Sequence, residues 1–245
     1  MKNYGLIGKT LKHSFSKKFF TEKFSTENID AQYELYELDT IEKFPQLISS
    51  VTLSGLNVTI PYKEQVIAYL DEVDPIAKAI GAVNTIQFKR KGNELKLCGY
   101  NTDVIGFKDS ILPHLKPVHK KALILGTGGA SKAIYYALNN LGIETLYVSR
   151  TPKEGQITYN DLDKAILSDY LLIVNCSPIG MYPNIDQAPD IPYKYLTNNH
   201  FLYDLVYNPE NTKFCQMARE MNAFSMNGLE MLHGQALASW EIWNK

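Results

Sequence analysis

The sequence predicts an α/β fold, with an N-terminal domain on a mostly parallel sheet and a second α/β domain after it. Three observations support this prediction. Strand-like and helix-like segments alternate in the first part of the chain, which is typical of parallel sheets with helical connections. An apolar run beginning at Leu123 leads through a glycine cluster into an amphipathic helix. Two later apolar runs are typical of strands that are buried on both faces.

The N-terminal elements are expected to alternate in type along the chain. The expected strands are 4–7, 31–38, 56–60, 81–88 and 94–97, and the expected helices are 16–24 and 41–49. Pro61 is expected to open a further helix, because a proline leaves no unpaired N–H at the first helical position. The buried face of that helix would consist of Val66, Ile67 and Leu70. Lys91-Gly92-Asn93 indicates a hairpin turn.

The glycine cluster is the most informative motif, and its residues are Gly126, Thr127, Gly128, Gly129, Ala130 and Ser131. Glycines allow a tight turn and a close backbone approach, after which the free N–H groups of a helix N-terminus face a pyrophosphate. The helix that follows has one apolar stripe and ends at Gly142, and an apolar run at 145–148 completes a βαβ unit. The motif therefore predicts a Rossmann-type domain that binds a dinucleotide.

The segment after the second strand of this unit indicates which dinucleotide is bound. An Asp or Glu about 20 residues after the glycines would bind a ribose 2′-hydroxyl. Ser149-Arg150-Thr151 stands there instead, and Lys153 follows. Since an arginine binds a 2′-phosphate in a charge-assisted fork, the loop predicts NADP rather than NAD. The alternative for Arg150 is a solvated arginine at a strand end.

The rest of the chain predicts a domain crossing and a C-terminal return. Residues 99–103 lead into an apolar-faced helix, and Pro113 and Pro117 close this passage. Strands are expected at 170–174 and 201–206, and Asn227-Gly228 marks a turn into a helix over 229–240. That helix is too short to form a domain. The expected domains are therefore 1–101 with 228–245, and 102–227.

Composition excludes several function classes. The chain has 245 residues, 45% of them hydrophobic, and a net charge of −1, which argues against nucleic acid or an anionic membrane as a partner. No apolar run approaches the roughly 18 residues that span a bilayer, and the first apolar run is short for a signal peptide, so we expect a cytoplasmic protein. We expect Cys98, Cys176 and Cys215 to be reduced core thiols. The five histidines lack metal-binding spacing, so no metal site is predicted.

Polar residues at the ends of the N-terminal strands are candidates for a ligand site. Ser14 and Ser16 stand near a helix start, where both hydroxyls can donate to a carboxylate; the alternative is an N-cap serine beside an uninvolved one. Lys63 would lie in the first turn of the helix after 56–60, where a cation is disfavoured; the alternative is a solvated lysine. Asp103 is a candidate carboxylate or the N-cap of the next helix.

Eight motifs, in order and over nearly the whole chain, resemble those of the shikimate dehydrogenases. They are His13–Ser16, Asn57–Lys63, Gly81–Thr85, Asn101–Asp103, Gly126–Ser131, Asn175–Met181, Tyr203–Tyr207 and Gly228–Gln235. The resemblance implies interconversion of 3-dehydroshikimate and shikimate with NADP, as in the chorismate route to aromatic amino acids. It also implies an N-terminal substrate domain that is hinged to a Rossmann domain, with the C-terminal helix returning to the substrate domain.

The resemblance also assigns roles to individual residues. The substrate carboxylate would meet Ser14 and Ser16, with Tyr207 near it. The ring hydroxyls would meet Thr59, Lys63, Asn84, Asp103 and Gln235, and Lys63 beside Asp103 would supply the proton that accompanies the hydride. The chain departs from the family in two places: Lys17 stands where a proline usually follows the Ser-x-Ser motif, and Ser149 replaces a common asparagine.

Two other functions share most of these motifs. A quinate dehydrogenase that uses NAD would carry an acidic residue where Ser149 and Arg150 stand. A non-catalytic nucleotide sensor on the same fold would be expected to lose the pair Lys63 and Asp103. Both residues are present. We expect a monomer or a homodimer.

Overall fold

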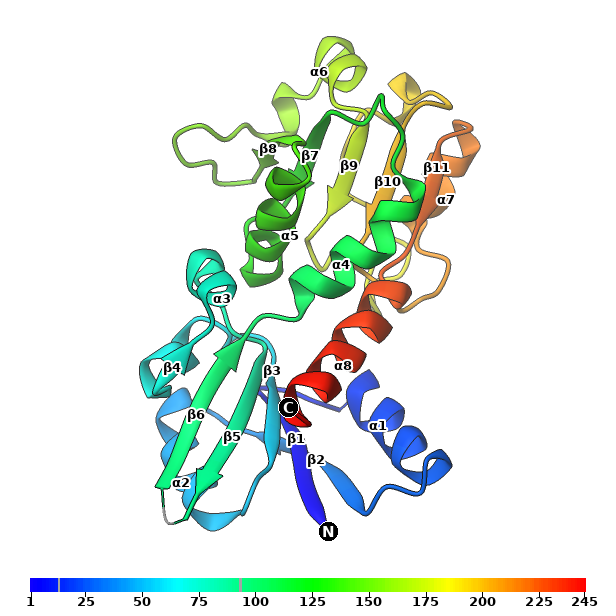
Figure 1. Cartoon of the computed structure of the whole chain (residues 1–245). Coiled ribbons are helices and arrows are strands. Elements are labelled where there is room, and N and C mark those ends of the chain that lie inside the picture. Colours follow the sequence, from blue (N-terminus) through cyan, green and yellow to red (C-terminus); the bar gives the residue numbers. More distant parts are fainter. Residues whose placement is uncertain (13, 93) are drawn as a thin grey trace. The chain divides into compact units, whose positions relative to one another are not determined.

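The chain forms two compact units in a computed structural model that describes residues 1–12, 14–92 and 94–245 (Figure 1). Unit 1 is Met1–Thr102 with Gln235–Lys245, and unit 2 is Asp103–Gly234. The chain returns to unit 1 within a helix, α8 (Leu229–Trp243), whereas we expected the return at 228. His13 of the first motif and Asn93 of the hairpin turn lie outside the described residues.

Unit 1 contains a six-stranded sheet in the order β2-β1-β3-β5-β6-β4. Its strands are β1 (Lys2–Gly8), β2 (Ala31–Glu37), β3 (Gly55–Val58), β4 (Glu72–Val73), β5 (Thr85–Lys91) and β6 (Glu94–Tyr100). β1 pairs in parallel with β2 and β3, and β4 with β6. The pairs β3–β5 and β5–β6 are antiparallel, which confirms the predicted hairpin.

Helices cover this sheet and divide its core into two clusters. The helices are α1 (Phe15–Thr26), α2 (Phe44–Ser50) and α3 (Pro75–Ile80), with short 3-10 helices η1 (Ile41–Lys43) and η2 (Gln65–Tyr69). Alternation along β1 places Tyr4 and Leu6 in a cluster with α1 and the end of α8, and Ile7 in a cluster with α2, η2 and α3. The sheet is therefore buried on both faces.

The helix expected to begin at Pro61 does not form. Residues 60–64 make turns that include a cis Ile60–Pro61 peptide bond, and only the five-residue η2 follows. The carbonyl of Lys63 accepts a hydrogen bond from the Val83 N–H at 2.7 Å, so it is used outside a helix. Val66 is buried in the core from this shorter segment. The placement of Lys63 in the first turn of a helix was therefore wrong.

Unit 2 contains a five-stranded parallel sheet in the order β11-β10-β9-β7-β8. Its strands are β7 (Lys121–Leu125), β8 (Glu144–Val148), β9 (Leu172–Asn175), β10 (Phe201–Asp204) and β11 (Phe224–Met226). Its helices include α4 (Asp103–Ile111), α5 (Gly129–Asn140), α6 (Lys164–Asp169) and α7 (Lys213–Glu220), with 3-10 helices η3 (Leu112–His114), η4 (Tyr159–Asp161) and η5 (Tyr193–Tyr195). The predicted βαβ unit is confirmed as β7-α5-β8, and Gly142 follows α5 with a φ of 73°.

In the part of the chain that the structure describes, no helix is long and apolar enough to cross a membrane. The same residues contain no group of three or more metal-ligating side chains. Cys98, Cys176 and Cys215 are free thiols, and Cys98 and Cys215 are buried.

The end of α8 anchors unit 1, and this contact generates a stability prediction. The indole of Trp243 donates to the Ile86 carbonyl at 3.0 Å and stacks on Tyr4 with ring centroids 4.8 Å apart. A Cβ on Gly55 would clash with this indole, so the missing side chain in β3 leaves room for the ring. We expect Trp243→Ala to lower the free energy of unfolding by about 3–5 kcal/mol, measured by urea denaturation.

Trp240→Ala is the matched control, because that ring packs on the same cluster but is only partly buried. Its loss should be clearly smaller. Equal losses in the two variants would contradict the anchoring role of Trp243.

Candidate functional site

The loops that carry chemistry in unit 2 leave the carboxyl ends of its parallel strands. The strand order reverses between β7 and β9, because β7 is followed by β8 on one side while β9 lies on the other. In open α/β sheets a ligand crevice forms outside the carboxyl ends at such a switch point. The glycine motif begins directly after β7, and Ser149, Cys176 and Leu205 begin the loops after β8, β9 and β10.

The glycine loop has the geometry of a phosphate cradle. Gly126 has a φ of 99°, which favours glycine, and a Cβ there would lie 3.3 Å from the Ser177 nitrogen. A Cβ on Gly128 or Gly129 would meet no atom within 4 Å, so their backbones face open space at the start of α5. Gly128 is the N-cap of α5 and has no side chain to cap it. These features fit a dinucleotide pyrophosphate, which approaches the backbone closely and accepts hydrogen bonds from its N–H groups.

The two residues that follow the glycines are placed differently. Ala130 lies in the first turn of α5 and is half-buried, whereas Ser131 is fully buried. The Ser131 hydroxyl donates to the Gly128 carbonyl at 2.6 Å. The Ser131 N–H donates to the same carbonyl at 2.9 Å, so both groups stabilise the loop from within.

The loop after β8 is closed at its base by backbone pairing and carries two exposed cationic side chains. Ile157 forms a parallel bridge with Val148, and the Ser149 N–H donates to the Ile157 carbonyl at 2.9 Å. Between these residues Arg150, Thr151 and Lys153 are exposed. The Ser149 side chain is buried, and its hydroxyl oxygen accepts from the Thr151 N–H at 3.3 Å. The arrangement can hold an anionic group without a neighbouring carboxylate at 149–151.

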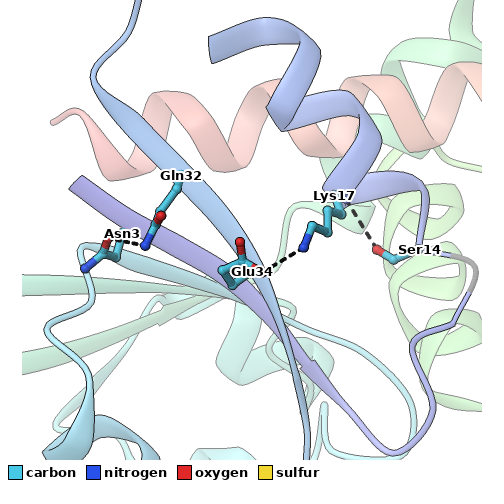
Figure 2. A network of polar contacts seen from close by, with 5 residues as sticks. All are labelled: Asn3, Ser14, Lys17, Gln32 and Glu34. Carbon is cyan, nitrogen blue, oxygen red and sulfur yellow. Dashed lines mark hydrogen bonds and ion pairs between the residues drawn. The ribbon is translucent and has the colours of Figure 1, made fainter. Parts of the chain in front are cut away.

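In unit 1, Ser14 and Ser16 lie at the start of α1, and both are half-buried. Ser14 is the N-cap, and its oxygen accepts from the Lys17 N–H at 3.4 Å. The ammonium of Lys17 forms an ion pair with Glu34 of β2 at 2.7 Å (Figure 2). Burial strongly raises the pKa of Tyr33, and a hydrogen bond with the Ser16 side chain lowers it in part. The residue that replaces the usual proline thus ties the Ser-x-Ser motif to the sheet.

The Asn84 side chain lies in a buried polar network within unit 1. Its oxygen accepts from the Thr102 N–H at 2.7 Å and from the Thr85 hydroxyl at 3.1 Å. Its Nδ2 is directed toward the Gln235 oxygen at 3.5 Å. With the oxygen committed to these donors, the Asn84 amide has one orientation, and its N–H₂ group faces Gln235.

Asn57 and Ser239 hold this network together, although the sequence did not single them out as site residues. Asn57 Nδ2 donates to the Ser239 hydroxyl at 2.9 Å, and Asn57 Oδ1 accepts from Tyr33 at 2.8 Å. The network therefore joins the Tyr33 side, next to Ser16, to the Asn84 side. One sequence signal was available: Asn57 is a polar residue inside an apolar strand.

The remaining predicted residues lie at strand ends or at a helix start. Thr59 follows β3 and is half-buried, as is Lys63 in the turns of 60–64. Tyr207 follows β10 in unit 2, and burial raises its pKa. Asp103 is the first residue of α4 and is buried.

The predicted residues therefore fall into two groups. Ser14, Ser16, Thr59, Lys63, Asn84 and Gln235 belong to unit 1, and Asp103, Tyr207, the glycine loop and the Arg150 loop belong to unit 2.

Residues 6–86 match the family model for the shikimate dehydrogenase substrate binding domain. Over 98% of its length the chain is 38% identical to a shikimate dehydrogenase (NADP(+)) of Carboxydothermus hydrogenoformans and covers 90% of that protein.

The chain belongs to the shikimate dehydrogenase family. Solved structures agree with this assignment. Shikimate dehydrogenase 1 from Peptoclostridium difficile is 38% identical with a TM-score of 0.83, and the match covers 100% of this chain and 92% of that one. The enzyme of Thermus thermophilus, solved with NADP(H) and shikimate, is 28% identical with a TM-score of 0.86 over 99% and 93% of the two chains.

Proposed function

We propose that this protein is an NADP-dependent shikimate dehydrogenase that interconverts 3-dehydroshikimate and shikimate. The observation that carries the proposal is the 38% identity, over nearly the whole chain, to curated relatives named for this activity with NADP. The glycine loop and the Arg150 loop support the cofactor, and the polar network around Asn84 supports a hydroxylated substrate. Unit 1 is then the substrate domain, and unit 2 is the cofactor domain.

The cofactor would be held by two loops of unit 2. The backbone of Gly126–Ser131 would bind the pyrophosphate at Gly128 and Gly129, where a Cβ would meet no atom and the first N–H groups of α5 have no helical partner. Arg150 would bind the 2′-phosphate in a charge-assisted fork, with Ser149, Thr151 and Lys153 around it. When bound, the nicotinamide supplies or accepts the hydride.

The substrate would be held by the side chains of unit 1 and by Tyr207. The hydroxyls of Ser14 and Ser16 would donate to the carboxylate, and the Tyr207 hydroxyl would lie near it. Thr59, Asn84 and Gln235 would bind ring hydroxyls. The network that fixes the Asn84 amide orients it before the ligand arrives, which lowers the cost of ordering on binding.

Lys63 and Asp103 would handle the proton. Reduction of a ketone needs a hydride at carbon and a proton at oxygen. The Lys63 ammonium would donate that proton to the ring oxygen, and the neutral amine would take it back in the reverse direction. The Asp103 carboxylate would orient the ammonium and accept from the same ring hydroxyl. The cytoplasmic location and the monomeric or homodimeric state stay predictions.

The direct test is an assay of the purified protein with shikimate and with quinate, each against NADP and NAD. We expect the highest kcat/KM for shikimate with NADP. A preference for quinate with NAD would contradict the proposal, because the loop after β8 lacks the acidic residue that NAD selectivity requires. Cofactor binding without turnover of either substrate would favour the alternative that the protein is a non-catalytic nucleotide sensor.

We expect Lys63→Ala to lower kcat by roughly 10²–10⁴-fold, because a positioned general acid contributes about that factor. The Michaelis constant for shikimate should change much less. Asp103→Ala should lower kcat to a similar extent as Lys63→Ala. The kcat of the double variant should be little lower than that of either single variant, because the two residues act as a unit. Steady-state kinetics measure all three variants, and circular dichroism verifies folding.

Lys78→Ala is the control, since Lys78 is an exposed lysine of α3 in the same unit. It should keep the parent rate. A folded Lys63→Ala protein that also stays within a few-fold of that rate would refute the proton-transfer role.

We expect Arg150→Ala to raise the Michaelis constant for NADP by on the order of tenfold or more and to leave that for NAD nearly unchanged. The reason is the loss of one charge-assisted phosphate contact, worth roughly 1.5–3 kcal/mol. Lys164→Ala removes an exposed cation of α6 and should change neither constant. An equal loss with both cofactors in Arg150→Ala would mean that the arginine does not bind the 2′-phosphate.

A further inference from the structure

Asp204, the last residue of β10, is a fully buried carboxylate that is only half satisfied. Its Oδ1 accepts from Asn175 Nδ2 at 2.9 Å and from the Val206 N–H at 3.0 Å. Its Oδ2 makes no hydrogen bond of ordinary geometry with any residue that the structure describes. The Thr212 hydroxyl lies near enough to lower the pKa of the carboxyl, but burial prevails and raises that pKa to about 6.

This acid destabilises unit 2 at neutral pH. Because its pKa is higher in the folded protein than its usual value of 3.8, folding favours the protonated form. The contribution of the protonated Asp204 carboxyl to the free energy of unfolding is fully present below pH 3.8 and is lost as the pH rises through about 6. The titratable groups around it are Cys176, Tyr193 and Cys215, whose own pKa values its charge helps to raise. All three are neutral at pH 7, so none compensates its charge.

The ionised carboxylate has a property that a neutral side chain lacks, because it can only accept hydrogen bonds. It therefore obliges Asn175 to present its N–H₂ group and to turn its oxygen the other way. That oxygen accepts from the Ser177 N–H at 3.0 Å and from the Ser177 hydroxyl at 2.6 Å. Asp204 and the Ser177 N–H thus fix the two ends of the Asn175 amide, which joins the carboxylate to the first turn of the loop after β9.

This loop lies against the glycine motif. The position of a Cβ on Gly126 is 3.3 Å from the Ser177 nitrogen and 3.4 Å from the Ser177 Cβ. A side chain at position 126 would therefore press on Ser177, so the two loops lie close together there. Hydrogen bonds therefore run from Asp204 through Asn175 to Ser177, which lies beside the backbone that begins the phosphate cradle, all within unit 2.

We propose that Asp204 is a positioning residue of the cofactor site, which uses its acceptor-only carboxylate to hold the loop after β9 against Gly126 in the form that receives the dinucleotide. The inference rests on the proposed function for the identity of the dinucleotide as NADP. The destabilisation by the buried acid at neutral pH is then offset by a pre-formed site.

The test is Asp204→Asn, which keeps the shape and the acceptor oxygen but replaces a charged acceptor with a neutral one, so that the hydrogen bond holding the Asn175 amide is weaker. We expect the variant to melt at a higher temperature than the parent at pH 8 and at an equal temperature near pH 4, where Asp204 is protonated. We also expect the dissociation constant for NADP, measured by calorimetric titration of the intact protein at pH 8, to rise roughly three- to tenfold. Stability and affinity should therefore change in opposite directions.

Two further variants make the outcome specific. Asp190→Asn removes an exposed charge that also acts on Tyr193 and should change neither NADP binding nor its pH dependence. Ser177→Ala should weaken NADP binding, and its combination with Asp204→Asn should be less than additive, because both act on the Asn175 amide.

Unchanged NADP affinity in Asp204→Asn, or an equal change in Asp190→Asn, would overturn the proposal and leave Asp204 as a purely structural acid. A stability difference that is constant from pH 4 to pH 8 would overturn it as well. A parent protein that binds NAD but not NADP would refute the proposed cofactor. In that case the same variants, titrated with NAD, test the positioning role separately.

Discussion

The close approach of Gly126 to Ser177 is the constraint on which the cofactor unit depends. Parallel strands end at one edge of a sheet, so β7, β8, β9 and β10 all send their loops to the same side. The loops after β7 and β9 lie close together where Gly126 adopts a φ of 99°, which favours glycine, and a Cβ there would lie 3.3 Å from the Ser177 nitrogen. The next two glycines leave open space over their backbone. The glycine loop thus combines a close approach to the neighbouring loop at Gly126 with an open backbone at Gly128 and Gly129, where phosphates can approach.

Unit 1 differs, since its candidate residues other than Lys63 are uncharged side chains that need a fixed orientation. Burying them costs free energy unless every donor finds an acceptor. Asn57 meets this need by bonding to Tyr33, Thr85 and Ser239, which come from three elements. The hydroxyls that support Asn84 are therefore held by the core itself. A site built this way is ordered before any ligand binds.

Local patterns were sufficient for the elements whose signals lie within one segment. The β7-α5-β8 unit, its terminating Gly142 and the β5–β6 hairpin were all predicted from spacing and turn residues. The prediction of a helix after Pro61 was wrong because the Lys63 carbonyl accepts a hydrogen bond from the N–H of a distant residue, Val83. Ser239 was missed as a partner of Asn57 because the two are 182 residues apart. The half-satisfied state of Asp204 also arises only in the folded sheet.

The two interpretations of Ser14, as a helix cap and as a carboxylate ligand, turn out to be compatible. A hydroxyl that caps a helix accepts through a lone pair, here from the Lys17 N–H, and keeps its proton for another partner. A proline at position 17 would have no N–H to give, so the lysine adds a bond that the usual motif lacks. Its ammonium is paired with Glu34, which directs that charge to the sheet. Capping thus leaves the Ser14 proton available for a substrate carboxylate.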